Sequence, residues 1–261
     1  MLFGKTILIT GVSSGIGART AELAGQLGAD VIGVDLNPPN PPIASFIQAD
    51  ISSPEAIADL VSRLPNRIDA LANVAGVSGL VGAAKTLAIN FYGLRALSQA
   101  AAPSIREGGS IVNIASIAGY GWRAELERAK GLIGVQGFPD VAALCRELDV
   151  PDAAGYPVSK EALILWTLRA AHLPVFKDRG IRVNAVSPGP VTTPLLTEFR
   201  TVLGDARVDS DIGRVGRSGT PNDIAPVALF LASDAARWIN GANIPVDGGL
   251  EASVNAEVMG F

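Results

Sequence analysis

The sequence of 261 residues contains one cysteine, Cys145, and one histidine, His172. A single cysteine excludes an internal disulfide and a multi-cysteine metal cluster, and a single histidine leaves no pair for a histidine-based zinc site. We therefore expect no bound metal. His172 lies in the stretch Ala-Ala-His-Leu-Pro-Val, which is typical of the end of a helix, so a structural or surface role is preferred over a part in a Ser-His-Asp triad.

Charge and long apolar runs are also scarce. Charged residues make up 18% of the chain, and the formal net charge is −4 with no block of lysine or arginine. The electrostatic footprint of a nucleic-acid-binding protein is therefore missing. No uninterrupted apolar run approaches the ~18 residues that a membrane helix needs, and the first residues do not resemble an export signal. We expect a cytoplasmic protein with neither a membrane nor a nucleic-acid partner.

The chain instead alternates short apolar segments with helical patterns. The apolar, β-branched segments predict strands at 5–10, 30–35, 45–48, 68–73, 109–116, 181–187 and 242–246. Helices are expected at about 18–27, from 54, at 83–104 and at 221–231. This alternation predicts an α/β fold of the Rossmann type, a doubly wound parallel sheet of about seven strands with helices on both faces. The length fits a single domain over residues 1–261.

A glycine-rich turn follows the first expected strand. In the spacing Gly11-x-x-x-Gly15-x-Gly17, the glycines let backbone N–H groups approach a phosphate at a helix N-terminus. Because it lies between a strand and a helix, this pattern favours a dinucleotide-binding site over a turn that binds no ligand. Asp35 ends the second strand, where a carboxylate can accept hydrogen bonds from the adenosine ribose and repel a 2′-phosphate. No lysine or arginine stands beside it or in the turn, so we expect NAD rather than NADP.

Tyr156 and Lys160 stand four residues apart and would share one face of a helix. A fixed ammonium beside a phenol lowers the phenol pKa, which would make Tyr156 a suitable general base. Pro157 fits the first turn of a helix and would place Tyr156 at an exposed helix start, facing a cleft. The same spacing is also common on solvated helix surfaces.

Three further polar residues each allow two interpretations. Ser116 ends the fifth strand, where a hydroxyl can bind a substrate oxygen or serve a turn. Asn90, inside the long helical pattern, indicates either a local kink or an exposed position. Asp50 is placed to contact the adenine, or to act as a cap or turn residue for the helix that begins near Pro54.

Six motifs occur together and in order along the chain: Thr10-Gly11-x-x-x-Gly15-Ile16-Gly17, Asn73-x-Ala75-Gly76, Asn90, Ser116, Tyr156-x-x-x-Lys160 and Pro188-Gly189. This set resembles the short-chain dehydrogenase/reductase family over almost the whole chain, and Val246-Asp247-Gly248-Gly249 completes the family pattern. The resemblance implies a nicotinamide-dependent enzyme that passes a hydride between an alcohol carbon and the cofactor.

The resemblance also implies roles for individual residues. Tyr156 would take or give the hydroxyl proton, and Lys160 would lower the tyrosine pKa and hold the nicotinamide ribose. Ser116 would fix the substrate oxygen, and Asn90 would position a water linked to Lys160. The implied cofactor-binding residues are Gly11, Ser13, Ser14, Gly15, Ile16, Gly17, Asp35, Asp50, Ile51, Asn73, Ala75, Gly76, Tyr156, Lys160, Pro188, Gly189, Val191 and Thr193.

One departure from the family pattern is large. The serine usually stands shortly before the tyrosine, whereas here an insertion at about 120–152, with helical patterns at 124–129 and 140–148, separates them. It resembles the branch that contains bacterial 3α-hydroxysteroid dehydrogenase/carbonyl reductase and coniferyl-alcohol dehydrogenase. So long a connection is uncommon unless it serves binding or assembly. We expect it to alter oligomer packing, cover the cleft, or both, in a homodimer or homotetramer.

The substrate is expected to be a fairly apolar alcohol or its aldehyde or ketone. The cleft should be lined by the insertion, by a mobile lid at about 195–219, and by Val77, Ser78, Tyr120, Trp122 and Leu195, with no arginine placed to bind a carboxylate. Phenylpropanoid alcohols of the coniferyl type are the preferred candidate substrates, and 3α-hydroxysteroids or other cyclic alcohols are the alternative. A non-catalytic NAD-sensing protein and a sugar epimerase or dehydratase are more distant alternatives.

Overall fold

The computed structural model describes residues 2–260, which contain a seven-stranded parallel sheet in the order β3-β2-β1-β4-β5-β6-β7. The chain begins in the middle of the sheet, runs to one edge, returns, and then builds the other edge. This topology confirms the predicted doubly wound Rossmann fold. The strands are β1 (Thr6–Thr10), β2 (Asp30–Asp35), β3 (Ser45–Gln48), β4 (Ile68–Asn73), β5 (Ile105–Ile114), β6 (Arg182–Pro188) and β7 (Asn243–Val246).

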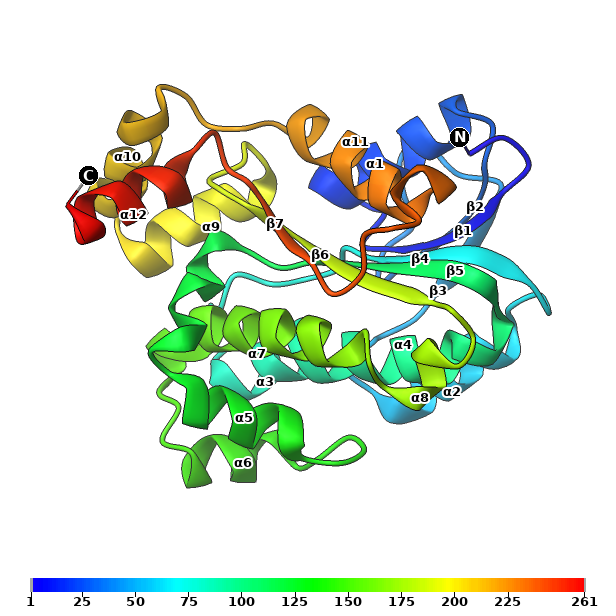
Figure 1. Ribbon diagram of the computed structural model, residues 1–261, viewed down its shortest axis with the longest axis horizontal. Helices are drawn as coiled ribbons and strands as arrows, with labels where there is room; N and C mark the ends of the chain where they lie inside the picture. Colours follow the sequence, from blue (N-terminus) through cyan, green and yellow to red (C-terminus); the bar gives the residue numbers. More distant parts are fainter. Residues whose placement is uncertain (1, 261) are drawn as a thin grey trace.

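Helices cover both faces of the sheet (Figure 1). One face carries α1 (Gly15–Gln26) and α11 (Pro221–Ala232), which pack against each other. The other carries α2 (Pro54–Ser62), α3 (Ala83–Leu87), α4 (Leu94–Ala101), α7 (Gly155–Ala170) and α8 (Pro174–Lys177). Successive side chains of a strand point to opposite faces, so Ile7 and Ile9 join the core under α11, whereas Leu8 joins the core under α4 and α7. All three are fully buried.

Outside the insertion and the segment 195–219, two expected elements differ from the sequence-based expectation by more than three residues or by a break. β5 begins at Ile105 instead of 109, and its pairing with β4 shifts register between Ile68 and Ala70. The helix expected over 83–104 is broken into α3, a π-helical segment Ala88–Gly93, α4 and a short 3₁₀ turn. Periodicity alone does not reveal these irregularities, because they depend on how the segment packs against its neighbours.

The inserted segment begins within a 3₁₀ turn (Ile117–Arg123) and continues through α5 (Leu126–Gly134) and α6 (Val141–Glu147). In Figure 1 both helices lie on the far side of α7 and α3 from the sheet, α5 against α7 and α6 against α3. Arg128 of α5 forms an ion pair with the buried Glu161 of α7 at 3.0 Å. The insertion is therefore fastened to the outside of the helical layer.

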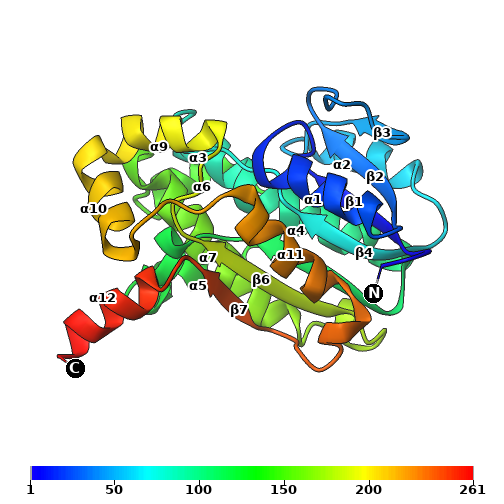
Figure 2. The same cartoon turned by 90° about the horizontal axis from the view of Figure 1, so that it is seen from above.

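Three helices lie beyond the carboxyl ends of the strands: α9 (Pro194–Leu203), α10 (Asp205–Val215) and α12 (Leu250–Met259). α12 packs against α10 and projects from the body of the molecule (Figure 2). Its anchors include an ion pair between Arg214 and Glu257 at 2.7 Å and a hydrogen bond from Tyr120 to Asn255. None of the helices within residues 2–260 combines the length and apolar character needed to cross a membrane.

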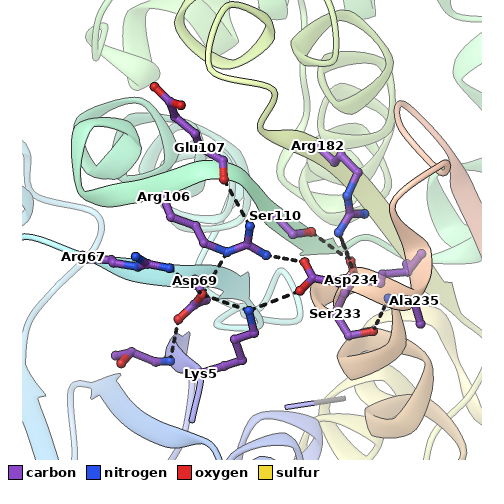
Figure 3. A network of polar contacts seen from close by, with 12 residues as sticks. Lys5, Arg67, Asp69, Arg106, Glu107, Ser110, Arg182, Ser233, Asp234 and Ala235 are labelled. Carbon is purple, nitrogen blue, oxygen red and sulfur yellow. Dashed lines mark hydrogen bonds and ion pairs between the residues drawn. The ribbon is translucent and has the colours of Figure 1, made fainter. Parts of the chain in front are cut away.

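Charged residues join the opposite, amino-terminal ends of the strands (Figure 3). Asp69 of β4 accepts a hydrogen bond from the Thr6 N–H at 3.0 Å and lies 2.8 Å from Arg106 Nε. Arg106 also pairs with Asp234, which lies 3.2 Å from Lys5. This network ties β1, β4 and β5 to the turn after α11 at the end of the sheet that faces away from the candidate site.

Candidate active site

A cavity of about 700 Å³ opens at the carboxyl ends of the strands, where open α/β sheets bind their ligands. It is lined by residues from the turns after β1, β2, β4, β5 and β6 and from α7, α9 and α10. Most of the residues expected from the sequence come together there, namely Gly11, Ser13, Ser14, Gly15, Ile16, Gly17, Asp35, Asp50, Ile51, Ala75, Gly76, Ser116, Tyr156, Lys160, Pro188, Gly189, Val191 and Thr193.

The glycine turn after β1 packs so closely that side chains would not fit. A Cβ atom on Gly17 would stand 1.9 Å from the Gly11 carbonyl oxygen. The Thr10 hydroxyl accepts hydrogen bonds from the N–H groups of Val74 and Ala75, both at 3.0 Å, which fixes this turn against the loop after β4. Ser14 makes no side-chain cap at the start of α1, so the first amides of the helix remain available to a ligand in the cavity. The turn therefore fits a dinucleotide pyrophosphate.

Asp35 and Asp50 line the same side of the cavity. Asp35 Oδ2 accepts a hydrogen bond from the Ser13 N–H at 3.0 Å. Asp50 Oδ1 accepts from the Ser52 N–H at 2.8 Å, so its role as a turn residue is present alongside its place in the cavity wall. The cap of α2 is Ser53, whose hydroxyl accepts a hydrogen bond from the Ala56 N–H.

Asn73 is an exception among the expected cofactor-binding residues, because it does not line the cavity. Its side chain is fully buried and donates hydrogen bonds to Ser98 and to Asn113, both at 2.8 Å. The Asn73 side chain therefore joins β4 to α4 and β5 inside the core, and the expected contact of this residue with a cofactor stays a prediction. The sequence motif located the residue at the end of β4, but it did not fix the direction of the side chain.

Asn90 lies in the π-helical segment, which confirms the expected kink, and its exposed fraction of 0% excludes the alternative of a surface position. Its side-chain oxygen accepts a hydrogen bond from the Val77 N–H at 2.8 Å, and its amide donates to the Val77 carbonyl at 2.9 Å. The amide also donates to Ser159 Oγ at 3.2 Å. Asn90 therefore holds a residue of the cavity wall, and its expected link to a water stays a prediction.

Tyr156 lies in the first turn of α7, as Pro157 predicted, but the expectation of an exposed position is wrong. Its side chain is 7% exposed, because the Phe199 ring packs on the Tyr156 ring with 4.5 Å between centroids. Lys160 Nζ lies 5.6 Å from the centre of the tyrosine ring and donates a hydrogen bond to the Ile114 carbonyl at 2.8 Å. Ser116 follows β5 and serves the turn that begins there, because its hydroxyl accepts a hydrogen bond from the Ala118 N–H at 3.1 Å. The same hydroxyl hydrogen-bonds the phenol of Tyr156.

Burial dominates the protonation of this pair. It raises the pKa of Tyr156 to about 12, although the hydrogen bond with Ser116 acts in the opposite direction. Burial also lowers the pKa of Lys160 to about 7. Burial therefore opposes the lowered tyrosine pKa expected from the sequence, because removing both groups from water disfavours both charged forms.

Helices α9 and α10 form the cavity wall near Tyr156, which we call the reacting end. The sequence predicted a poorly periodic segment at about 195–219 instead of these helices. Of the five residues expected to line the cleft, Val77 and Leu195 do so, and Ser78, Tyr120 and Trp122 do not. Residues 119–152 are also missing from the lining, so the insertion contributes no wall to the cavity within one chain, and its expected part in covering the cleft or in assembly stays a prediction. No sequence pattern predicted this arrangement, because the sequence does not indicate against which face of α7 the insertion packs.

Sequence reasoning also missed charged residues in the wall. Glu198 and Arg207 both line the cavity, although no arginine was expected there. Arg207 Nε is paired with Asp211 at 3.0 Å, and the Ser78 hydroxyl donates a hydrogen bond to Glu198 Oε2. Helical spacing could have placed Glu198 and Phe199 on α9 but not beside Ser78 and Tyr156.

A doubly wound sheet with a glycine-lined phosphate site at its carboxyl edge defines a dinucleotide-binding protein. Residues 5–126 match the family model described as short chain dehydrogenase, and residues 141–251 match the one described as Enoyl-(Acyl carrier protein) reductase. The chain is 43% identical to coniferyl-alcohol dehydrogenase of Pseudomonas sp. (strain HR199 / DSM 7063), over 97% of this chain and 98% of that protein. It belongs to the short-chain dehydrogenase family, whose members are oxidoreductases that bind a nicotinamide cofactor.

Two other relatives are named for hydroxysteroids. The chain is 28% identical to 3-alpha-hydroxysteroid dehydrogenase/carbonyl reductase of Comamonas testosteroni, over 94% of this chain and 96% of that protein. The solved structure of 3-alpha-hydroxysteroid dehydrogenase from Pseudomonas sp. B-0831, complexed with NADH, matches with a TM-score of 0.81 and 29% identity, over 97% of this chain and 99% of that chain. These matches extend over the inserted segment as well as the nucleotide-binding part.

Proposed function

We propose that this protein is an NAD-dependent alcohol dehydrogenase that interconverts a phenylpropanoid alcohol of the coniferyl type and its aldehyde. The observation that carries the proposal is the 43% identity with coniferyl-alcohol dehydrogenase over nearly the whole of both chains. The cavity supports it, because Leu195, Leu196 and Phe199 give the reacting end an apolar wall that suits an aromatic alcohol.

NAD, when bound, would supply the hydride acceptor for alcohol oxidation. The glycine turn would hold the pyrophosphate, Asp35 the adenosine ribose, and Lys160 the nicotinamide ribose. Val191 and Thr193, which line the cavity after β6, would hold the nicotinamide end. The Asp35 carboxylate favours NAD because it would repel the 2′-phosphate of NADP at the end of β2. The relative solved with NADH is consistent with this preference.

The proton transfer is assigned to Tyr156, with Ser116 fixing the substrate oxygen. Because burial holds the tyrosine pKa at about 12, the phenol carries its proton at neutral pH and can donate it to a carbonyl oxygen. Alcohol oxidation needs the reverse transfer, and Lys160, one helical turn away, would stabilise the phenolate when its amine is protonated. Asn90 keeps Val77 in the wall beside this group.

Oxidation of a 3α-hydroxysteroid or another cyclic secondary alcohol is the second candidate. It is favoured by the TM-score of 0.81 with a 3-alpha-hydroxysteroid dehydrogenase. We further propose that α9 and α10 form the substrate lid of a single-domain protein that works in the cytoplasm as a homodimer or homotetramer. Light scattering of the purified protein measures the assembly, and cell fractionation tests the compartment.

The test is the absorbance of reduced nicotinamide with either NAD or NADP, over coniferyl alcohol, androsterone and simple cyclic alcohols. Turnover of coniferyl alcohol with NAD supports the proposal, turnover of androsterone alone selects the second candidate, and silence with every alcohol refutes both. An Asp35→Ser variant should shift the preference toward NADP. Asp30→Ser, which removes an exposed carboxylate at the other end of β2, is its matched control.

A further inference from the structure

We propose that Glu198 determines substrate specificity: its carboxylate accepts a hydrogen bond from a second, non-reacting hydroxyl of the substrate and repels substrates that carry a carboxylate there. This inference deepens the proposed alcohol dehydrogenase activity and rests on it. The substrate class that it selects is a neutral alcohol with a hydroxyl at the end remote from the reacting carbon, such as the phenolic hydroxyl of a 4-hydroxycinnamyl alcohol.

The first support is a comparison of the carboxylates that line the cavity, which are Asp35, Asp50, Glu198 and Asp211. Asp35 accepts hydrogen bonds from two backbone N–H groups, at 3.0 and 3.2 Å. Asp50 accepts from the Ser52 N–H and lies 3.5 Å from Lys85 Nζ. Asp211 is paired with Arg207 at 3.0 Å. Each of these three therefore has a cation or two backbone donors.

Within the described part of the chain, Glu198 has neither a cation nor a backbone donor. Among residues 2–260, no lysine or arginine forms an ion pair with it, and the Ser78 hydroxyl is its hydrogen-bond donor. Ser78 is 1% exposed, and its hydroxyl bonds to the Oε2 atom of Glu198 and not to the Oε1 atom. Within the same range Oε1 has no hydrogen-bond partner, so one acceptor atom of this carboxylate remains open to a ligand.

Glu198 lies at the end of the cavity that contains Tyr156, where the substrate is proposed to bind. The next residue along α9, Phe199, packs on the Tyr156 ring at 4.5 Å. Ser78 follows Val77, which Asn90 holds in the cavity wall beside α7. Asp35 and Asp50, in contrast, lie at the ends of β2 and β3, on the far side of β1 in the sheet.

The apolar surroundings of Glu198 require a bound ligand to supply a hydrogen-bond donor to its carboxylate. Leu195, Leu196 and Phe199 flank Glu198 on α9 and also line the cavity. A ligand that fills this wall removes water from the open Oε1 atom, and a carboxylate that loses water without gaining a donor is strongly destabilised. A phenolic hydroxyl replaces that water with a charge-assisted hydrogen bond. A second carboxylate would add like-charge repulsion at low dielectric.

The experiment compares 4-hydroxycinnamyl alcohol with cinnamyl alcohol, which differ by the phenolic hydroxyl alone. The measured quantity is the ratio of kcat/KM for the two alcohols with the NAD-loaded enzyme. We expect the ratio to fall about tenfold or more in Glu198→Gln, since hydrogen bonds to charged groups contribute about 1.5–3 kcal/mol. We also expect 4-carboxycinnamyl alcohol, which carries a carboxylate in place of the phenolic hydroxyl, to inhibit the oxidation of cinnamyl alcohol by this variant more strongly than by the wild type. Glutamine keeps an acceptor for Ser78, so the local fold is retained.

The control is Asp209→Asn, which removes one negative charge from α10 at a residue that does not line the cavity and pairs with Arg200 at 2.8 Å. This variant should keep the wild-type ratio. If Glu198→Gln leaves the ratio and the inhibition unchanged while cinnamyl alcohol is still oxidised, the inference is refuted and the proposed function stands. If the wild type oxidises neither alcohol, both are refuted. NADH fluorescence titration establishes that each variant is folded.

Discussion

Replacing Tyr156 by phenylalanine separates the proposed proton transfer from every other property of the site. The change removes the phenol oxygen and keeps the ring, so the contact with Phe199 at 4.5 Å and the burial of the site are preserved. The structural loss is the hydrogen bond with Ser116, which contributes about 1 kcal/mol to stability. The chemical loss is larger, since a positioned general acid or base contributes about 10²–10⁴-fold to the rate.

We therefore expect kcat for alcohol oxidation to fall by about 10²–10⁴-fold. Thermal unfolding should shift by only a few degrees, and NADH affinity should stay within about twofold of the wild type, because only the proton-transfer group is lost. The assay is reduced-nicotinamide absorbance together with NADH fluorescence titration. Tyr120→Phe is the matched control, since this hydroxyl lies outside the cavity and bonds to Asn255.

Residual turnover above about a tenth of the wild-type rate would contradict the assignment of Tyr156, since a positioned acid or base is worth at least about a hundredfold. Equal losses in Tyr156→Phe and Tyr120→Phe would point to a general structural effect. Loss of NADH binding in Tyr156→Phe alone would mean that the phenol serves the cofactor rather than the proton.

Three further changes test the framework of the site. Gly17→Ala should weaken NADH binding at least about tenfold in a fluorescence titration, because its Cβ would stand 1.9 Å from the Gly11 carbonyl oxygen. Urea unfolding should show that the free energy of unfolding rises from about pH 7 to about pH 9. The folded Lys160 pKa of about 7 lies below the ordinary value of 10.5, so the unfolded chain binds more protons than the folded chain between these two pH values. Lys160→Met should flatten this rise. Arg128→Met should lower the free energy of unfolding by about 1–3 kcal/mol, because it leaves the buried Glu161 carboxylate without its cation. The double variant Arg128→Met/Glu161→Gln should recover most of this lost stability.

Local chemistry explains why much of the fold was readable from the sequence. Strand bounds at 30–35, 45–48 and 68–73 agree with β2, β3 and β4, because buried parallel strands are short, continuous apolar runs. The glycine turn and the Tyr156–Lys160 spacing were also readable, since each depends on residues within one turn of the chain. The resulting prediction of a doubly wound dinucleotide-binding sheet is confirmed.

Side-chain direction was less readable, even where the residue was correctly located. Asn73 ends β4 as expected, yet its amide is used inside the core by Ser98 and Asn113. Asn90 lies at the predicted kink, yet its hydrogen bonds go to the backbone of Val77. In both cases the partner is distant in the sequence, so no local pattern specifies it.

The sequence by itself determined the order of strands and helices, the family and the residues that gather at the carboxyl edge of the sheet, because periodicity, glycine spacing and motif order are properties of neighbouring residues. Only the tertiary structure decided that the insertion covers α7 from outside, that Glu198 bonds to Ser78, 120 residues away in the sequence, and that burial raises the pKa of Tyr156 and lowers that of Lys160. These properties depend on which distant segments meet and how much water they exclude, and both are fixed only when the chain is folded.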